Sequence, residues 1–363
     1  MKRRTFLHAG AAASLLGTLP GFARAEQFDP RPGPWRYFDV TTRIDVLRPS
    51  GATRAWVPLP SLNSDFQRVI GNSWSGNAPG VRVAADPKYG AQMVYAEWPA
   101  GENRPLLAIT SRVATRNRAV DFSKPDPAIR LRAADARFNT APTTLIPTDG
   151  IVRKTALQIV QGEKTELGKA RAIYQWIVDN TFRDPKVRGC GIGDIKSMLE
   201  TGNLSGKCAD LNSLYVGLAR AVGLAARDVY GVRVAKSAFG YKSLGAGGPD
   251  ITKAQHCRAD VFIAGYGWVP VDPADVRKVV LEEPPGKLAL DNPKVVAARK
   301  TLFGHWEMNW MAYNTAHDIR LPGSSGPAIA FLMYPQAETD KGRLDPLDPA
   351  DFRYTITAQE IQA

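Results

Sequence analysis

The chain of 363 residues has little cysteine and no long apolar run after its N-terminal region. Its three cysteines are too few for a scaffold built on disulfides, and no spacing of cysteine and histidine resembles a zinc site. No later stretch is apolar enough to form a transmembrane helix. Motifs typical of cofactor binding are also missing, so we expect no cofactor.

The composition is that of a globular protein. Hydrophobic residues make up 44% and charged residues 23%, which argues against a disordered or collagen-like chain. The length favours two domains, or three. The 27 prolines and 32 glycines provide for many turns, which indicates a large content of β structure.

The N-terminal segment 1–25 is typical of an export signal. Arg3 and Arg4 precede Phe6-Leu7, a pattern characteristic of twin-arginine signals, and a short apolar stretch follows at 9–19. Ala23-Arg24-Ala25 then provides the small residues of a cleavage site. We expect cleavage after Ala25, a periplasmic or secreted protein, and no transmembrane anchor after cleavage.

The net charge is positive with or without this signal. The full chain carries +12, and +8 remains once the four basic residues of 1–25 are removed. Such a charge favours anionic partners such as cell-wall polymers or lipid headgroups. Because export separates the protein from most nucleic acid, nucleic acid is not an expected partner.

The pattern along the chain predicts a β half, a helical middle and a mixed end. Short runs rich in β-branched and aromatic residues predict a β-sandwich-like domain at 26–125, and a stretch rich in proline and threonine predicts a linker at 126–150. A helix capped by Thr165 opens the core at 151–285. A C-terminal extension, 286–363, is expected to complete or flank the core. Its aromatic cluster at 304–314 either lines a substrate groove or packs against the core.

The reactive chemistry is predicted around Cys208. Apolar residues at helical spacing follow it as far as Val222, and Gly223 is a natural helix stop. Cys208 would then lie in the first turn, where free N–H groups and the helix dipole favour an anion. That position lowers the pKa of a thiol. A lone cysteine at a helix start is, however, more often a small buried apolar residue.

Two further residues are predicted to meet across a hairpin. His256 begins one strand and Asp272 ends the next, each eight residues from Ala264, with Gly265 and Gly267 at the turn. Asp272 could therefore orient His256, and His256 could accept the proton of Cys208. Taken singly, a histidine is usually structural and an Asp before Pro usually forms a turn.

Several stretches resemble the bacterial transglutaminase-like superfamily. They are the segment Gly206-Lys207-Cys208 with its helix, then His256, and then the run from Gly267 to Pro273. Over residues 150–280 the resemblance implies an α+β, papain-like fold, in which a nucleophile helix packs on an antiparallel sheet. It implies a triad of Cys208 as nucleophile, His256 as general base and acid, and Asp272 as its orienter. Many members follow the histidine with a small residue and then Trp, where this chain has Cys257-Arg258.

The sequence predicts the oxyanion donors and the state of the other two cysteines less clearly. The Cys208 N–H is one expected oxyanion donor, with Asn203 and Gln255 as weaker candidates for a second. Cys190 and Cys257 either pair as a disulfide in an oxidising compartment or stay buried thiols. Since Cys257 directly follows His256, its side chain is expected on the opposite face of the strand.

The sequence therefore favours an exported, cysteine-dependent enzyme that acts on an amide bond through a thioester. Hydrolysis by water would make it a peptidase or amidase of a protein or cell-wall peptide. Attack by a lysine amine would make it a crosslinking transglutaminase. A binding module of the cell envelope without catalysis is the other alternative.

Overall fold

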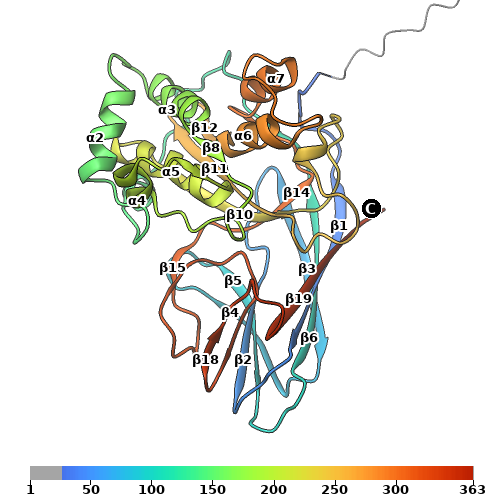
Figure 1. Ribbon diagram of the computed structural model, residues 1–363. Coiled ribbons are helices and arrows are strands. Elements are labelled where there is room, and N and C mark those ends of the chain that lie inside the picture. Colours follow the sequence, from blue (N-terminus) through green and yellow to red (C-terminus); the bar gives the residue numbers. More distant parts are fainter. Residues whose placement is uncertain (1–26, 363) are drawn as a thin grey trace, which may run out of the picture.

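The structure is a computed structural model that describes residues 27–362 (Figure 1). The predicted export signal at 1–25 lies outside the described residues. Within 27–362, we find no helix with both the length and the apolar character needed to cross a bilayer.

One half of the molecule is a β-sandwich of two antiparallel sheets. The first has the strand order β19-β1-β6-β3 and the second β18-β17-β2-β5-β4. Along β1, alternate side chains are buried, as a strand with one face on a core requires. The strands of the first sheet are β1 (Arg36–Val46), β3 (Gln67–Gly76), β6 (Leu106–Thr115) and β19 (Phe352–Ile361). Those of the second are β2 (Thr53–Pro58), β4 (Gly80–Ala85), β5 (Gln92–Trp98), β17 (Gln336–Thr339) and β18 (Gly342–Leu344).

The end of the chain belongs to both halves of the fold. Strand β19 pairs with β1 along most of its length, and β17 pairs with β2, so the last strands complete the sandwich. Only the earlier part of 286–363 joins the core, through α7 (Pro293–Thr301) and β14 (Trp310–Asn314). The extension expected on the core is therefore divided between the core and the sandwich, because its last strands pair with strands near the start of the chain.

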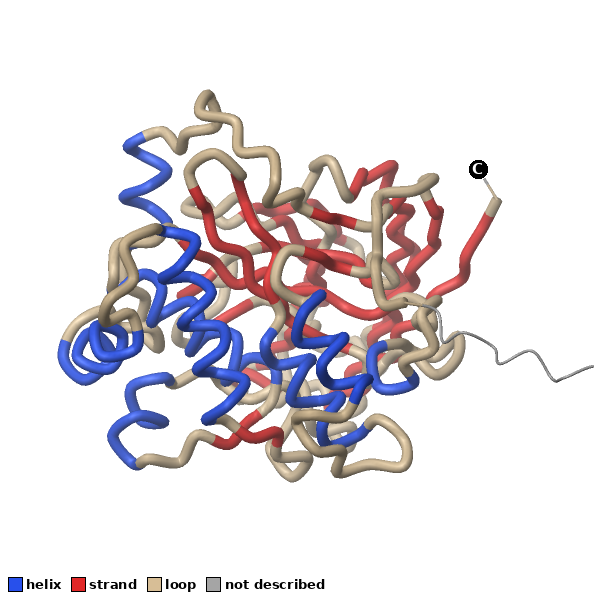
Figure 2. Tube along the Cα trace, turned by 90° about the horizontal axis from the view of Figure 1, so that it is seen from above, coloured by secondary structure: helices blue, strands red, loops and turns tan. Residues whose placement is uncertain are grey.

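The other half is a four-stranded antiparallel sheet covered by helices. Its order is β12-β11-β10-β14, and helix α5 packs against β10 and β11 (Figure 1). Viewed from above, the helices gather along one side of the molecule and most strands along the other (Figure 2). The further elements are α2 (Gly150–Ile159), α3 (Glu166–Asn180), α4 (Ile195–Thr201), α5 (Cys208–Ala221), β10 (Ala226–Arg233), β11 (Gln255–Ile263), β12 (Gly267–Val271) and α6 (Pro273–Glu282). This arrangement confirms the predicted α+β fold with a nucleophile helix on an antiparallel sheet.

Short elements connect these layers. The segment 126–150, expected to be a linker, contains a helix without buried residues, α1 (Ala133–Thr140). The remaining pieces are β7 (Arg118–Ala119), β8 (Phe182–Arg183), β9 (Ser205–Gly206), η1 (Lys242–Leu244), β13 (His305–Trp306), β15 (His317–Ile319) and β16 (Ile329–Phe331). The β8–β9 pair is parallel and lies just before α5, so it fixes the start of that helix.

Two helices follow their predicted patterns closely. In α3 the Thr165 hydroxyl accepts a hydrogen bond from the Gly168 N–H, at 3.0 Å, as a helix cap. Helix α5 begins at Cys208 and ends before Gly223, whose φ of +84° suits glycine. Every side chain of α5 is buried, so its position relative to the sheet is tightly determined.

Gly231 allows the central strand β10 to approach its neighbour. A Cβ atom there would lie 2.2 Å from the Met311 carbonyl oxygen and 2.4 Å from the ring of Trp310. The Trp310 indole N–H donates to the His256 carbonyl at 2.8 Å. The close approach at Gly231 therefore supports the strand that carries His256. Because Trp306 and Trp310 are both fully buried, the aromatic cluster at 304–314 packs in the core.

Candidate active site

Cys208 is the first residue of α5, and a buried carboxylate fixes the backbone around it. Asp210 accepts hydrogen bonds from the N–H of Lys207 at 2.9 Å and from the N–H groups of Ile192 and Gly193 at 3.0 Å each. The Ala209 N–H donates to the Cys190 carbonyl at 2.9 Å. The upstream loop at 190–193 is thus held against the start of the nucleophile helix.

Gly191 makes this attachment possible. Its φ is +88°, and a Cβ atom would lie 1.9 Å from a carboxylate oxygen of Asp210. Any other residue there would have to displace the carboxylate that joins loop and helix. The sequence shows Gly189, Gly191 and Gly193 around Cys190, but this pattern did not reveal its connection to Cys208.

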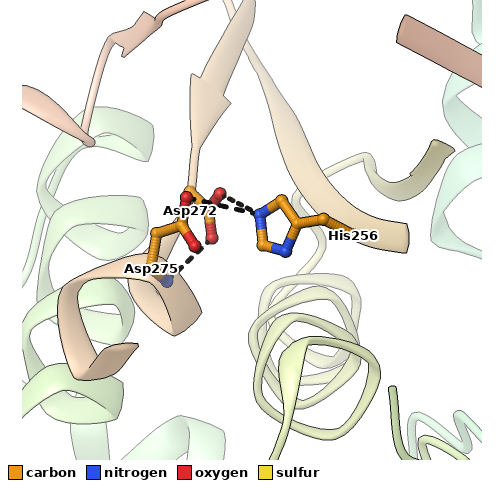
Figure 3. A group of neighbouring side chains, drawn as sticks. All are labelled: His256, Asp272 and Asp275. Atoms are coloured by element: carbon orange, nitrogen blue, oxygen red, sulfur yellow. Dashed lines mark hydrogen bonds and ion pairs between the residues drawn. The ribbon is translucent and has the colours of Figure 1, made fainter. Parts of the chain in front are cut away.

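His256 and Asp272 meet as the hairpin pattern predicted. Their strands pair from Ala259 with Val271 to Ile263 with Gly267, so the turn centres on Gly265. His256 Nε2 lies 2.7 Å from Oδ2 of Asp272, and both residues are buried (Figure 3). Asp272 also caps α6, because its Oδ1 accepts from the Asp275 N–H at 3.0 Å. The helix cap thus fixes the carboxylate that orients the histidine.

Cys208 completes the group. Cys208 and His256 line the same cavity, and His256 lowers the pKa of the Cys208 thiol. The Nε2 of His256 is already occupied by Asp272. Nδ1 is therefore the imidazole nitrogen left for the thiol. The structure brings together all three residues expected from the sequence, at the start of one helix, the start of one strand and the start of another helix.

A second carboxylate, Asp275, was not recognised in the sequence. Its Oδ2 lies 3.4 Å from His256 Nε2 (Figure 3). Both of its oxygens accept from the Arg233 guanidinium, at 2.6 and 2.8 Å. It lies in the first turn of α6, three residues after Asp272, so both carboxylates face the histidine. An Asp-x-x-Asp spacing at a helix start was the available signal, although such spacing is also common in ordinary caps.

Two buried arginines balance these carboxylates. Arg233 pairs with Asp275, while Nε of Arg258 lies 3.5 Å from Oδ2 of Asp272. The guanidinium of Arg258 also packs 4.8 Å from the ring centroid of Trp310. His256, Asp272 and Asp275 are the one group within 27–362 whose spacing would suit a metal ion. Since both carboxylates are already paired with arginine, the group is organised to hold a histidine rather than a metal.

The charges at the site favour an ion pair between thiolate and imidazolium. The pKa of Cys208 is held well below its usual value by hydrogen bonds from Cys190 and Cys257 and by His256, against the effect of burial. Burial alone would lower the pKa of His256, but Asp275 and Asp272 outweigh it and raise that pKa to about 9. Between these two pKa values Cys208 is the nucleophilic thiolate and His256 the proton donor.

All three cysteines are free thiols, and all are buried. Cys190 and Cys257 thus match the second of the two alternatives drawn from the sequence. Both lower the pKa of Cys208, which the alternation along β11 did not indicate for Cys257. The hydrogen bond to Cys208, burial and the charge of the thiolate together raise the pKa of Cys190 well above its usual value. Cys190 therefore stays protonated, and its thiol donates to the Gln255 carbonyl at 3.3 Å.

Replacing Cys190 with alanine should raise the pKa of Cys208. Cys190 makes the largest contribution that lowers the pKa of Cys208, and alanine removes this thiol with little change in volume. We expect the rate of Cys208 alkylation at about pH 6 to fall several-fold, while the rate at high pH is unchanged. The measurement is a pH series of iodoacetamide labelling. The control is Ser197→Ala, at an exposed position of α4. An unchanged midpoint would contradict the role given to Cys190.

The two weaker oxyanion candidates are placed differently. Asn203 is exposed, and its Oδ1 accepts from the N–H and the hydroxyl of Ser205 at 3.2 and 2.6 Å. Gln255 lines the cavity over Cys208, next to His256. As the first residue of α5, Cys208 has an N–H without an acceptor inside the helix. The geometry therefore favours the Cys208 N–H, with Gln255 rather than Asn203 beside it.

The cavity over Cys208 and His256 has a volume of about 580 Å³. The apolar wall of the cavity is formed by four side chains of the sandwich strands and the loops next to them. They are Tyr334, Leu347, Phe352 and Tyr354. Phe352 and Tyr354 lie on β19, which pairs with the first strand of the sandwich. The sandwich thus forms part of the wall of this cavity.

The chain is similar to known proteins, both in its core and over most of its length. Residues 153–273 match the model of the transglutaminase-like superfamily. An uncharacterized protein of Haemophilus influenzae is 36% identical over 342 residues, which cover 89% of this chain and 91% of that protein.

Two solved structures match the chain at lower identity, and the first of them resembles its fold. The first is titled a "Putative Cysteine Protease" from Cytophaga hutchinsonii. It has a TM-score of 0.55 and 14% identity, and the match covers 92% of this chain and 93% of that one. The periplasmic domain of TgpA from Pseudomonas aeruginosa gives a TM-score of 0.35 and 17% identity, over 72% of this chain and 75% of that one. The chain therefore belongs to one family with the Haemophilus influenzae protein, and its core is a transglutaminase-like domain.

Proposed function

We propose that this protein is an exported cysteine hydrolase that cleaves amide bonds in a peptide or protein. The observation that carries the proposal is the 2.7 Å contact of His256 with Asp272, with Cys208 beside His256 in the lining of the same cavity. In the proposed reaction the Cys208 thiolate attacks the carbonyl carbon, and the imidazolium gives its proton to the leaving amine. Water then hydrolyses the thioester, with neutral His256 as the base.

Hydrolysis is favoured over crosslinking by the charge around Cys208. A crosslinking enzyme must bring a lysine amine to the thioester. The cavity is lined by six arginines and lysines and by one carboxylate, Asp250. A protonated lysine is repelled by such a surface, whereas water enters freely.

Export is the second part of the proposal, and it depends on the pattern in residues 1–25. The paired Arg3 and Arg4 would direct the chain through the twin-arginine route. A substrate in the cell envelope, such as a cell-wall peptide, is then the accessible class. Changing Arg3 and Arg4 together to lysine should keep the protein inside the cell, as fractionation would measure.

The test of function is to incubate the protein with a peptide mixture from a bacterial proteome and a fluorescent primary amine. We expect new peptide termini by mass spectrometry, no amine incorporation, and neither product with Cys208→Ala. Amine incorporation exceeding cleavage would instead identify a crosslinking enzyme. Absence of both products, together with slow alkylation of Cys208, would indicate a binding module.

A further inference from the structure

The cavity over Cys208 has strongly basic walls. Six cationic side chains line it, and they come from separate parts of the chain. They are Arg183, Arg188, Lys207, Arg233, Lys253 and Lys278. The carboxylates beside His256 do not need this concentration of positive charge, because Arg233 already balances Asp275 and Arg258 balances Asp272.

The carboxylates near these cations are too few to neutralise them. Arg233 pairs with Asp275, and Arg188 pairs with Asp345. Arg183 and Lys278 share a single partner, Glu282. Across the described part of the chain, no carboxylate lies within 4.0 Å of the amine of Lys207 or Lys253. With Asp250 included, four carboxylates therefore face six cations, and the cavity keeps an excess of positive charge.

Two of the lysines lie at the reactive end of the cavity. Lys207 immediately precedes Cys208, so its Cα is about 3.8 Å from that of the nucleophile. Arg183 pairs with Gly206 across the β8–β9 ladder and shares Glu282 with Lys278. These contacts connect Lys278 to the strand pair that precedes Lys207, and both lysines line the cavity.

Lys278 is held in an unfavourable environment for a cation. Burial and the neighbouring Arg233 lower its pKa to about 8, although Asp275 opposes the effect. Its closest carboxylate contact, to Glu282, is 3.8 Å long. An anion entering the cavity would relieve this cost, because it would supply the missing counter-charge.

We propose that the site is specific for acidic peptides, with Lys207 and Lys278 binding a carboxylate within about one residue of the scissile amide. The inference rests on the proposed function, since it names the substrate class of that site. The apolar side chains of Tyr334, Phe352 and Tyr354 would contact the rest of the peptide. The volume of about 580 Å³ is within the range of pockets that enclose a small ligand.

Two alkylating reagents test this charge preference without a known substrate. Iodoacetate and iodoacetamide react with the same thiolate through the same step, a displacement of iodide by sulfur. They differ in that iodoacetate carries a carboxylate. The ratio of their rate constants at Cys208 therefore cancels any change in the thiolate fraction and reports the charge of the cavity.

We expect this ratio to fall at least about tenfold in the double variant Lys207→Gln/Lys278→Gln. Lys154→Gln, an exposed position on α2, should leave the ratio unchanged. In the wild-type protein the ratio should also fall as the salt rises from about 0.01 M to about 1 M, because the screening length shortens about tenfold. Since His256 is present in every variant, its own charge cannot account for the difference.

A matched pair of peptides extends the test to the substrate. We expect acetyl-Ala-Glu-Ala-amide to protect Cys208 from iodoacetamide at a concentration several-fold lower than acetyl-Ala-Gln-Ala-amide does. The double variant should lose this difference. Circular dichroism of the double variant establishes that it is folded, and Lys278→Arg, which keeps the charge, should retain the preference.

The outcomes separate this inference from the proposed function. Fast labelling by iodoacetamide with equal ratios in wild type and double variant would overturn the acidic specificity alone. Slow labelling by both reagents would overturn the proposed function itself. A lower ratio in the double variant, with selective protection by the glutamate peptide, would support both.

Discussion

Replacing His256 with alanine should lower the rate of amide cleavage on the order of 10²–10⁴-fold. The imidazolium stabilises the Cys208 thiolate and supplies the proton to the leaving amine, and alanine removes both effects. Cleavage of the peptide mixture, measured as new termini per unit time, checks the expectation. In Cys208→Ala, which lacks the nucleophile, the rate should fall further, to that of the uncatalysed background.

The matched control for this variant is His305→Ala. His305 is half-buried on β13, and the residues lining the cavity do not include it. Its replacement should leave the rate within about twofold of wild type. If His256→Ala kept more than a tenth of the wild-type rate while remaining folded, the assignment of His256 as base and acid would be wrong.

Replacing Asp272 with alanine should destabilise the fold by about 3–5 kcal/mol. The carboxylate faces His256 at 2.7 Å and Arg258 at 3.5 Å, and it accepts from Asn212 at 3.2 Å and from the Asp275 N–H at 3.0 Å. Alanine removes the carboxylate that compensates the buried charge of Arg258. Burial already disfavours that charge, since it lowers the pKa of Arg258 to about 10. Urea denaturation measures the free energy of unfolding.

Asp149 provides a control at an equivalent position of another helix. It precedes α2 as Asp272 precedes α6, but it is exposed and its side chain makes no capping hydrogen bond. Asp149→Ala should therefore change the free energy of unfolding by less than about 0.5 kcal/mol. An Asp272→Ala variant whose stability matches that of Asp149→Ala would show that the Asp272 carboxylate does not support the fold as its contacts indicate.

A second substitution of Asp272 separates its effect on the cleavage rate from its effect on the free energy of unfolding. Asp272→Asn keeps the size of the side chain and an oxygen for the Asp275 N–H, but it removes the charge that stabilises the imidazolium. In a serine–histidine–aspartate triad such a change costs on the order of 10⁴-fold in turnover. The rate should therefore fall far more in Asp272→Asn than the free energy of unfolding would explain.

The parts of the site that follow from local pattern were predictable from the sequence. Cys208 lies where an apolar helical stripe begins, and His256 and Asp272 lie at equal distances from a glycine-rich turn. Each relation depends on residues close together in the chain. Periodicity and turn chemistry are sufficient to detect such relations.

The long-range parts were not predictable from these patterns. Arg233, Arg258 and Asp275 carry the charge balance of the site, but their pairing depends on how three elements pack. The contact of Cys190 with Cys208 requires the loop around Cys190 to fold back onto the start of α5. Strand β19 pairs with β1, close to the other end of the described chain. The local sequence of β19 does not predict which strand it pairs with.

The most direct test of an activated Cys208 is the pH profile of its labelling by iodoacetamide, with the labelled residue identified by mass spectrometry. We expect fast labelling already at about pH 6, well below the ordinary thiol pKa of about 8.5, and its loss in His256→Ala. Hydrolysis should in turn decline as the pH rises through about 9, where His256 loses its proton. Labelling that rises only near the ordinary thiol pKa, and equally in wild type and His256→Ala, would contradict an activated cysteine–histidine pair.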